Sequence, residues 1–125
     1  MNVWKKLAYA GLLLAGVIGA ARGDDPADAG QRVFEQRCQG CHAGGPRKDS
    51  SLGANLRGIV GTKAGTQSTG VHSLAAIESG IVWDRGSLRR FLSDPQRAMP
   101  GTLMPTGVPD AAELEKLLDY LETLR

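Results

Sequence analysis

Aromatic residues and β-branched runs are scarce in this chain, and both shortages limit what it can be. Its 125 residues include two phenylalanines, two tryptophans and two tyrosines, against 17 glycines. A core so poor in aromatic side chains predicts that a bound apolar group fills the middle of the fold. Because no run of β-branched residues resembles a strand of a parallel sheet, we expect an all-α domain.

The chain also lacks a large excess of positive or negative charge. Fifteen basic and thirteen acidic residues give a net charge of +2. No basic block is paired with aromatic residues, which argues against nucleic-acid binding. The charges are unevenly spread, because residues 32–97 carry a net +5 and the segments 24–31 and 98–125 together carry −6. A mixed, solvated surface explains most of this, but a positive side that orients the molecule toward an acidic partner is the sharper hypothesis.

Residues 1–23 have the pattern of a secretion signal. Lys5 and Lys6 precede an apolar run from Leu7 to Ala21, and small residues follow. The run is shorter than the roughly 20 residues that span a bilayer. We therefore expect cleavage and a mature domain of residues 24–125 in the periplasm, with no stable membrane insertion. An uncleaved N-terminal segment that tethers the domain to the membrane is the alternative.

Both cysteines lie in the segment Cys38-Gln39-Gly40-Cys41-His42. This spacing is typical of a c-type haem attachment site, where one turn of backbone presents both thiols to the haem vinyl groups. The histidine that follows then lies under the iron and can ligate it. One haem would account for both cysteines of the chain.

Other interpretations of the same segment stay open at this point. A Cys-x-x-Cys pair can be a redox dithiol, which should follow a strand, whereas the residues before Cys38 have a helical pattern. A plain disulfide fits the exported compartment equally well. A zinc site needs four ligands, or three and a water, and only His42 and His72 are available as nitrogen ligands.

Helix signals predict four or five short helices joined by glycine-rich loops. The first helix should begin at an Asp25 cap and run to about Gln39. A short helix is expected over Leu74–Ser79, and another over Ser87–Ser93 with Ser87 as its cap. Pro95 should stop that helix.

The last helix has the clearest signal, with Asp110 as its cap and Glu113 three residues on, as in a capping box. Five leucines form an apolar stripe that must pack on another element, and the first helix is the obvious partner: Leu114, Leu117, Leu118, Leu121 and Leu124. By contrast, residues 43–70 are too glycine-rich for regular structure. So long a loop is reasonable if it wraps a prosthetic group.

The ligand on the second face of the iron decides what such a protein does. An open face allows small molecules to bind, whereas a second strong ligand leaves only electron exchange. The candidates are Met104, Met99 and His72. Met104 is the preferred one, because two prolines and a glycine keep residues 100–105 extended and stiff, as needed to hold a thioether against iron. The competing interpretation of either methionine is that of an ordinary core residue. Met99, just before Pro100, is the second candidate for the ligand.

Taken in order and at this spacing, these residues resemble the small soluble monohaem cytochromes c of mitochondria and bacteria. The resemblance covers residues 28–125 and rests on the haem motif and on several matching features: Gly30, Phe34, the loop 55–65, Trp83, the segment 100–104, and 117–121 with Tyr120. It implies the cytochrome c fold, wrapped around one haem c that is bound covalently through Cys38 and Cys41. His42 and Met104 would be the axial ligands. Trp83 would donate to a haem propionate, and Asn55 and Thr102 would line the haem.

The chain departs from the family pattern at three places around the haem. Ala54 stands where the family often has a proline whose carbonyl orients the ligating histidine, and its carbonyl can still accept the imidazole N–H. Thr62 replaces an arginine that commonly meets a propionate. The expected aromatic hydroxyl is missing, so that His72 or Ser73 must serve instead. We therefore expect fewer cationic contacts to the propionates.

The function that follows from the resemblance is that of a single-electron carrier, not an enzyme. The expected partners are redox proteins, a dehydrogenase or a membrane respiratory complex, which a monomer would meet through transient electrostatic docking. Two alternatives are kept. A labile Met104 bond would give a peroxidase-like or gas-binding haem domain, and tight association would make the chain a dedicated subunit of a dehydrogenase complex.

Overall fold

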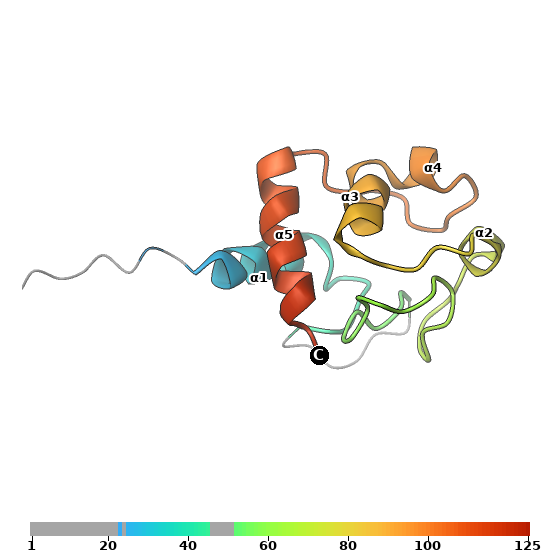
Figure 1. The fold of residues 1–125 in the computed structure, drawn as a ribbon, viewed down its shortest axis with the longest axis horizontal. Helices are drawn as coiled ribbons and strands as arrows, with labels where there is room; N and C mark the ends of the chain where they lie inside the picture. Colours follow the sequence, from blue (N-terminus) through green and yellow to red (C-terminus); the bar gives the residue numbers. More distant parts are fainter. Residues whose placement is uncertain (1–22, 24, 46–51) are drawn as a thin grey trace, which may run out of the picture.

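The computed structural model describes residues 23, 25–45 and 52–125. These residues form five α-helices (Figure 1): α1 (Pro26–Arg37), α2 (Leu74–Glu78), α3 (Arg85–Ser93), α4 (Pro95–Ala98) and α5 (Ala111–Thr123). In the described ranges there is no strand, only an isolated bridge between Lys63 and Val82. The all-α prediction is confirmed. The predicted signal segment lies outside the described residues except for Gly23.

Helix α1 begins where the sequence predicts. The Asp25 side chain accepts a hydrogen bond from Ala27 N at 2.9 Å, and Pro26 occupies the first helical position. The helix ends at Arg37 with Cys38 as its C-cap. It packs across α5 at Gly30, where a Cβ atom would lie 2.6 Å from Tyr120 Cβ and even closer to the Lys116 carbonyl oxygen. The absence of a side chain at this position allows the two helices to touch.

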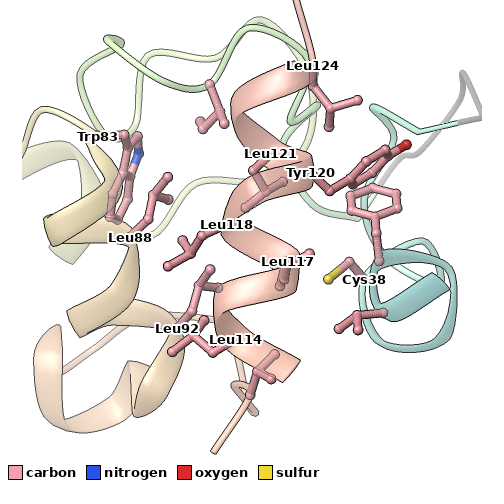
Figure 2. Close-up of a cluster of buried hydrophobic side chains, with 14 of the residues drawn as sticks. Cys38, Trp83, Leu88, Leu92, Leu114, Leu117, Leu118, Tyr120, Leu121 and Leu124 are labelled. Atoms are coloured by element: carbon pink, nitrogen blue, oxygen red, sulfur yellow. The ribbon is translucent and has the colours of Figure 1, made fainter. Parts of the chain in front are cut away.

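Helix α5 is the centre of the core. All five leucines of its stripe are buried, with Leu117 and Leu118 at 0% exposure. Figure 2 shows Leu117 directed toward α1 and Cys38, and Leu118 toward Leu88 and Leu92 of α3. The stripe therefore packs on two helices, α1 and α3, rather than on α1 alone.

The region of α3 and α4 corrects two predictions. Asp84, not Ser87, caps α3, because the Asp84 carboxylate accepts from Ser87 N at 2.7 Å and Ser87 Oγ accepts from Asp84 N at 2.8 Å. Pro95 does not simply stop a helix. It is the first residue of α4, capped by Asp94, because a proline needs no N–H partner at that position.

The long segment between α1 and α3 has little regular structure, as predicted. In its described part, 43–45 and 52–73, there is no helix. Large apolar side chains are exposed on this segment and on the residues that follow it: Leu52, Val60, Val71, Leu74, Ile77, Val82 and Leu103, at 41–72% exposure. Some of these side chains are available for a bound apolar group to cover.

Candidate haem site

The two thiols sit on one turn at the end of α1. Cys38 O accepts hydrogen bonds from Cys41 N at 3.0 Å and from His42 N at 2.8 Å, which closes that turn. No disulfide joins the two cysteines. Cys38 is buried, and this burial raises the pKa of its thiol to about 11 despite the nearby Arg37, whereas Cys41 is exposed. A neutral thiol toward the core and a second thiol at the surface, one turn apart, suit attachment of a group that lies along the core.

The His42 ring is oriented by the following loop. Its Nδ1 lies 2.7 Å from the carbonyl oxygen of Ala54. Because a carbonyl only accepts, Nδ1 carries the hydrogen, and a neutral ring then keeps its Nε2 lone pair for a metal. The contact expected at Ala54 from the family resemblance is therefore present.

Gly53 fits the same ring closely. A Cβ atom on Gly53 would lie 2.5 to 2.9 Å from three ring atoms of His42. The loop thus contacts the His42 ring in two ways. The Ala54 carbonyl lies at hydrogen-bond distance from Nδ1, and the backbone of Gly53, which has no side chain, packs against the ring. The Gly53 contact was not predicted, since Gly53 is one glycine among several in this loop.

The two candidate thioethers both lie in residues 99–108, here called the methionine loop, but they differ in burial. Met99 is 4% exposed and belongs to the core, whereas Met104 is half-buried and packs against the core edge. Thr102 Oγ1 accepts from Met104 N at 3.3 Å, which places the Thr102 side chain within the loop itself. Met104 is the thioether that remains available to a group bound beside the core.

The other predicted site residues lie as follows. Trp83 is buried and packs on Phe91 with ring centroids 5.2 Å apart. Asn55 Oδ1 accepts from Arg57 N at 2.9 Å and so stabilises the loop. Ser73 caps α2. His72 Nε2 lies 2.8 Å from Gln67 O.

Two of the positions where the chain departs from the family pattern, Thr62 and His72, are connected through Gln67. Gln67 also donates to Thr62 Oγ1 at 2.8 Å, so Thr62, Gln67 and His72 are linked. In this arrangement Thr62 and His72 share one polar cluster at the positions where the family resemblance implies propionate contacts.

The chemistry of the available donors fits a covalently bound haem. Two thiols on one turn, an imidazole with a spare nitrogen, a half-buried thioether and a run of exposed apolar side chains are the groups that such a cofactor requires. A zinc site finds no support. Nowhere in the described ranges do three or more His, Cys, Asp or Glu side chains gather as a metal cluster would need.

Comparison with known proteins decides the family. The family model for cytochrome c matches residues 27–125. The chain belongs to the cytochrome c family. It is 35% identical over 102 residues to cytochrome c2 of Rhodoblastus acidophilus, covering 81% of this chain and 94% of that one. With cytochrome c2 of Blastochloris viridis it is 34% identical over 119 residues, covering 94% and 92%.

A solved structure agrees with both relatives. The chain superposes on cytochrome cH from Methylobacterium extorquens with a TM-score of 0.70 and 34% identity, covering 78% of this chain and 97% of that one. This cytochrome c therefore has the fold of an electron carrier with haem c bound covalently, and Cys38 and Cys41 form its attachment motif. None of the helices in the described ranges is both long and apolar enough to cross a bilayer.

An open hollow of about 450 Å³ lies beside α3 and α4. It is lined by apolar and charged side chains: Ile81, Ser87, Arg90, Phe91, Ser93, Asp94, Arg97 and Ala98. Because Phe91 also packs on Trp83, this hollow adjoins the buried tryptophan.

Proposed function

We propose that this cytochrome c is a periplasmic single-electron carrier, with residues 1–23 a cleaved signal peptide and residues 24–125 the haem domain. His42 and Met104 would be the axial ligands. The observation that carries the proposal is the 2.7 Å contact between His42 Nδ1 and Ala54 O. It fixes the imidazole one residue after the second thiol with Nε2 left for iron.

When bound, the haem supplies a one-electron iron couple. The chain's residues hold the ligands where neither oxidation state requires a new geometry. His42 is held by the Ala54 carbonyl, and Met104 is held on a loop stiffened by two prolines. A thioether raises the potential compared with a second imidazole. Trp83, Asn55 and Thr102 complete the proposed haem contacts, with Trp83 donating to a propionate.

Visible spectra of the purified protein, oxidised and reduced, test the ligand assignment. Wild type and Met99→Leu should both show a low-spin haem and the methionine-to-iron charge-transfer band. Met104→Leu should lose that band and bind carbon monoxide when reduced. Carbon monoxide binding by reduced wild type at neutral pH would favour the alternative of a labile sixth ligand. Retention of the band in Met104→Leu would exclude Met104 as the ligand.

The mass of the exported protein tests the compartment and the domain boundary. Cleavage after the apolar run should leave a periplasmic species with the mass of a chain starting near residue 24 plus one haem. A species in the membrane fraction with the full-length mass would favour the tethered alternative. Co-purification with a dehydrogenase would instead support the dedicated-subunit alternative.

Partner docking is proposed to be transient and electrostatic, with the chain a monomer. Arg37 forms an ion pair with Glu113, in which Arg37 Nη2 lies 2.6 Å from Glu113 Oε2. The geometry of this contact is not that of a hydrogen bond. Exposed Lys63, Arg90 and Arg97, in contrast, form no ion pair within 4 Å among the described residues, although, after the hydrogen bonds from Ser87, the charge of Arg90 contributes to the lowered pKa of the Asp84 carboxyl. Arg90 and Arg97 flank the hollow beside α3 and α4, which makes this face suitable for an acidic partner surface.

The dependence of electron-transfer rate on salt tests that docking face. The second-order rate with an acidic redox partner should fall as ionic strength rises, because charges beyond a Debye length become screened. Arg90→Gln/Arg97→Gln should be slower at low salt and less salt-sensitive than Lys116→Gln on α5. Equal salt dependence in both variants would exclude this face.

A further inference from the structure

The methionine loop is anchored at both ends by backbone hydrogen bonds. Met99 N donates to Pro95 O at 2.9 Å, and Val108 N donates to Leu92 O at 2.7 Å. Gly107 fits directly against Leu92 and Pro95, because a Cβ atom there would lie 2.7 Å from Pro95 Cδ. The ends of the loop are therefore fixed to the region where α3 meets α4.

The middle of the loop depends on one side chain from outside it. Gln96 Nε2 donates to Met104 O at 2.9 Å and to Thr102 O at 3.3 Å. In the described part of the chain, no other side chain from outside the loop bonds the backbone of residues 102–106. A glutamine amide carries two N–H hydrogens, so one nitrogen can serve both carbonyls.

Gln96 is itself well placed to act as a brace. It follows Pro95, which is buried at the first position of α4, and Asp94 caps this helix by accepting from Arg97 N at 3.2 Å. The Gln96 backbone is thus tied to the core, whereas its amide reaches the exposed loop. The two bonds run from a fixed element to the carbonyl of Met104 itself.

We propose that Gln96 is a positioning residue for Met104. By holding the carbonyls of Thr102 and Met104, it keeps the Met104 thioether at the iron and slows its replacement by other ligands. This inference rests on the proposed ligation by Met104. The exposed Gln96 would thereby control how often the bond between Met104 and iron breaks.

Imidazole titration of the oxidised protein tests the role of Gln96, with loss of the methionine-to-iron band as the readout. Gln96→Ala should bind imidazole about tenfold more tightly than wild type, because two exposed hydrogen bonds no longer favour the closed loop. Gln96→Glu keeps the length but lacks the N–H donors at neutral pH, so it should behave like Gln96→Ala. Gln96→Lys restores a donor of similar reach and should return the affinity toward wild type. Gln36→Ala, an exposed glutamine on α1, is the matched control.

Amide hydrogen exchange provides a second readout that does not depend on added ligand. Exchange at Met104 N–H should quicken in Gln96→Ala, while exchange in α1 and α5 stays as in wild type. Wild-type imidazole affinity and exchange in Gln96→Ala would overturn the inference while leaving Met104 as ligand. If Met104→Leu keeps the methionine band, the proposed ligation and the role of Gln96 both fail.

Discussion

The hydrogen bond that orients His42 uses a backbone oxygen, so the path of the chain through residue 54 matters more than its side chain. The family resemblance implies a proline at this position, and an alanine serves as well because its carbonyl lies 2.7 Å from the imidazole. The neighbouring Gly53 is more restrictive. It contacts the ring with bare backbone, and any side chain there would enter the space of the imidazole.

Gly53→Ala tests this restriction. The new Cβ would meet His42 ring atoms at 2.5 to 2.9 Å, so either the ring or the loop must move. We expect a loss of about 1–3 kcal/mol in the free energy of unfolding, the usual cost of overpacking, and a weakened His42–Ala54 contact. Urea unfolding and the visible spectrum measure both effects. Gly86→Ala, where the nearest atoms would lie 3.3 Å or more from the new Cβ, should be nearly neutral, and an equally neutral Gly53→Ala would show that the loop moves without cost.

At the level of elements, the crossing of α1 and α5 depends on one missing side chain. Gly30→Ala would push a Cβ into the Lys116 carbonyl and to within 2.6 Å of Tyr120 Cβ. Since backbone stands in the way, we expect a destabilisation of about 3 kcal/mol, at the upper end of overpacking costs. The urea midpoint should fall without a change in the haem spectrum at low urea. A midpoint equal to that of wild type would mean that the helices separate easily.

The contact between α3 and α5 is charged at its surface and should respond to acid. Arg85 lies 2.8 Å from each of Glu115, Asp119 and Glu122, and Arg89 Nε lies 2.6 Å from Glu115. Hydrogen bonds from Arg89, and then from Arg85, lower the pKa of Glu115 from 4.5 to about 2.

Because the folded-state pKa of Glu115 is lowered, the stability that it contributes is fully present above its unfolded pKa of 4.5 and is lost as pH falls toward 2. The melting temperature of Glu115→Gln should therefore lie below that of wild type at pH 7 by a small margin, and the gap should close between about pH 4.5 and pH 2. Glu78→Gln on α2 is the control. A gap that does not change across this range would exclude the ion pairs as its cause.

Sequence patterns predicted four of the five helices, including the short α2 (Leu74–Glu78), and missed only α4. The α5 stripe and the Asp25 cap were predictable because each follows from a local periodicity or a single side chain. Helix α4 was missed, since Pro95 was interpreted as a stop although an Asp–Pro pair also starts helices. The cap of α3 was assigned to Ser87, whose hydroxyl bonds Asp84 N within a reciprocal pair that begins three residues earlier.

The attachment motif was likewise accessible from the sequence because of its fixed spacing, and the Ala54 contact was expected from the family resemblance. The roles of Met104, Trp83, Asn55 and Thr102 toward the haem stay predictions. Gln96 was out of reach, because its bonds depend on where α4 turns, and that helix was not foreseen. A contact between an exposed side chain and loop carbonyls six and eight residues further on leaves no periodic signal in a single sequence.

At the scale of the whole molecule, the fold should depend on its cofactor. Seven large apolar side chains between residues 52 and 103 are 41–72% exposed, so burying the exposed part of each would contribute about 1 kcal/mol, roughly half the value for a fully exposed side chain. Covering five of them would supply about 5 kcal/mol, comparable to the net stability of many small domains.

Removal of the haem tests this dependence. Cys38→Ala/Cys41→Ala, purified without haem, should lose most of its helical circular dichroism and its cooperative urea transition. Added haem should restore part of both through the proposed axial ligands. A haem-free variant with wild-type helix content and urea midpoint would show that α1, α3 and α5 suffice alone.

The pairing of α1 with α5 joins segments from opposite ends of the described chain. During synthesis, α1 cannot pack on α5 until the C-terminal residues of the chain have been made. If the polypeptide is exported as proposed, it remains unfolded until the leucines of α5 have crossed the membrane. During that time the two thiols at the end of α1 remain accessible to an enzyme that attaches haem.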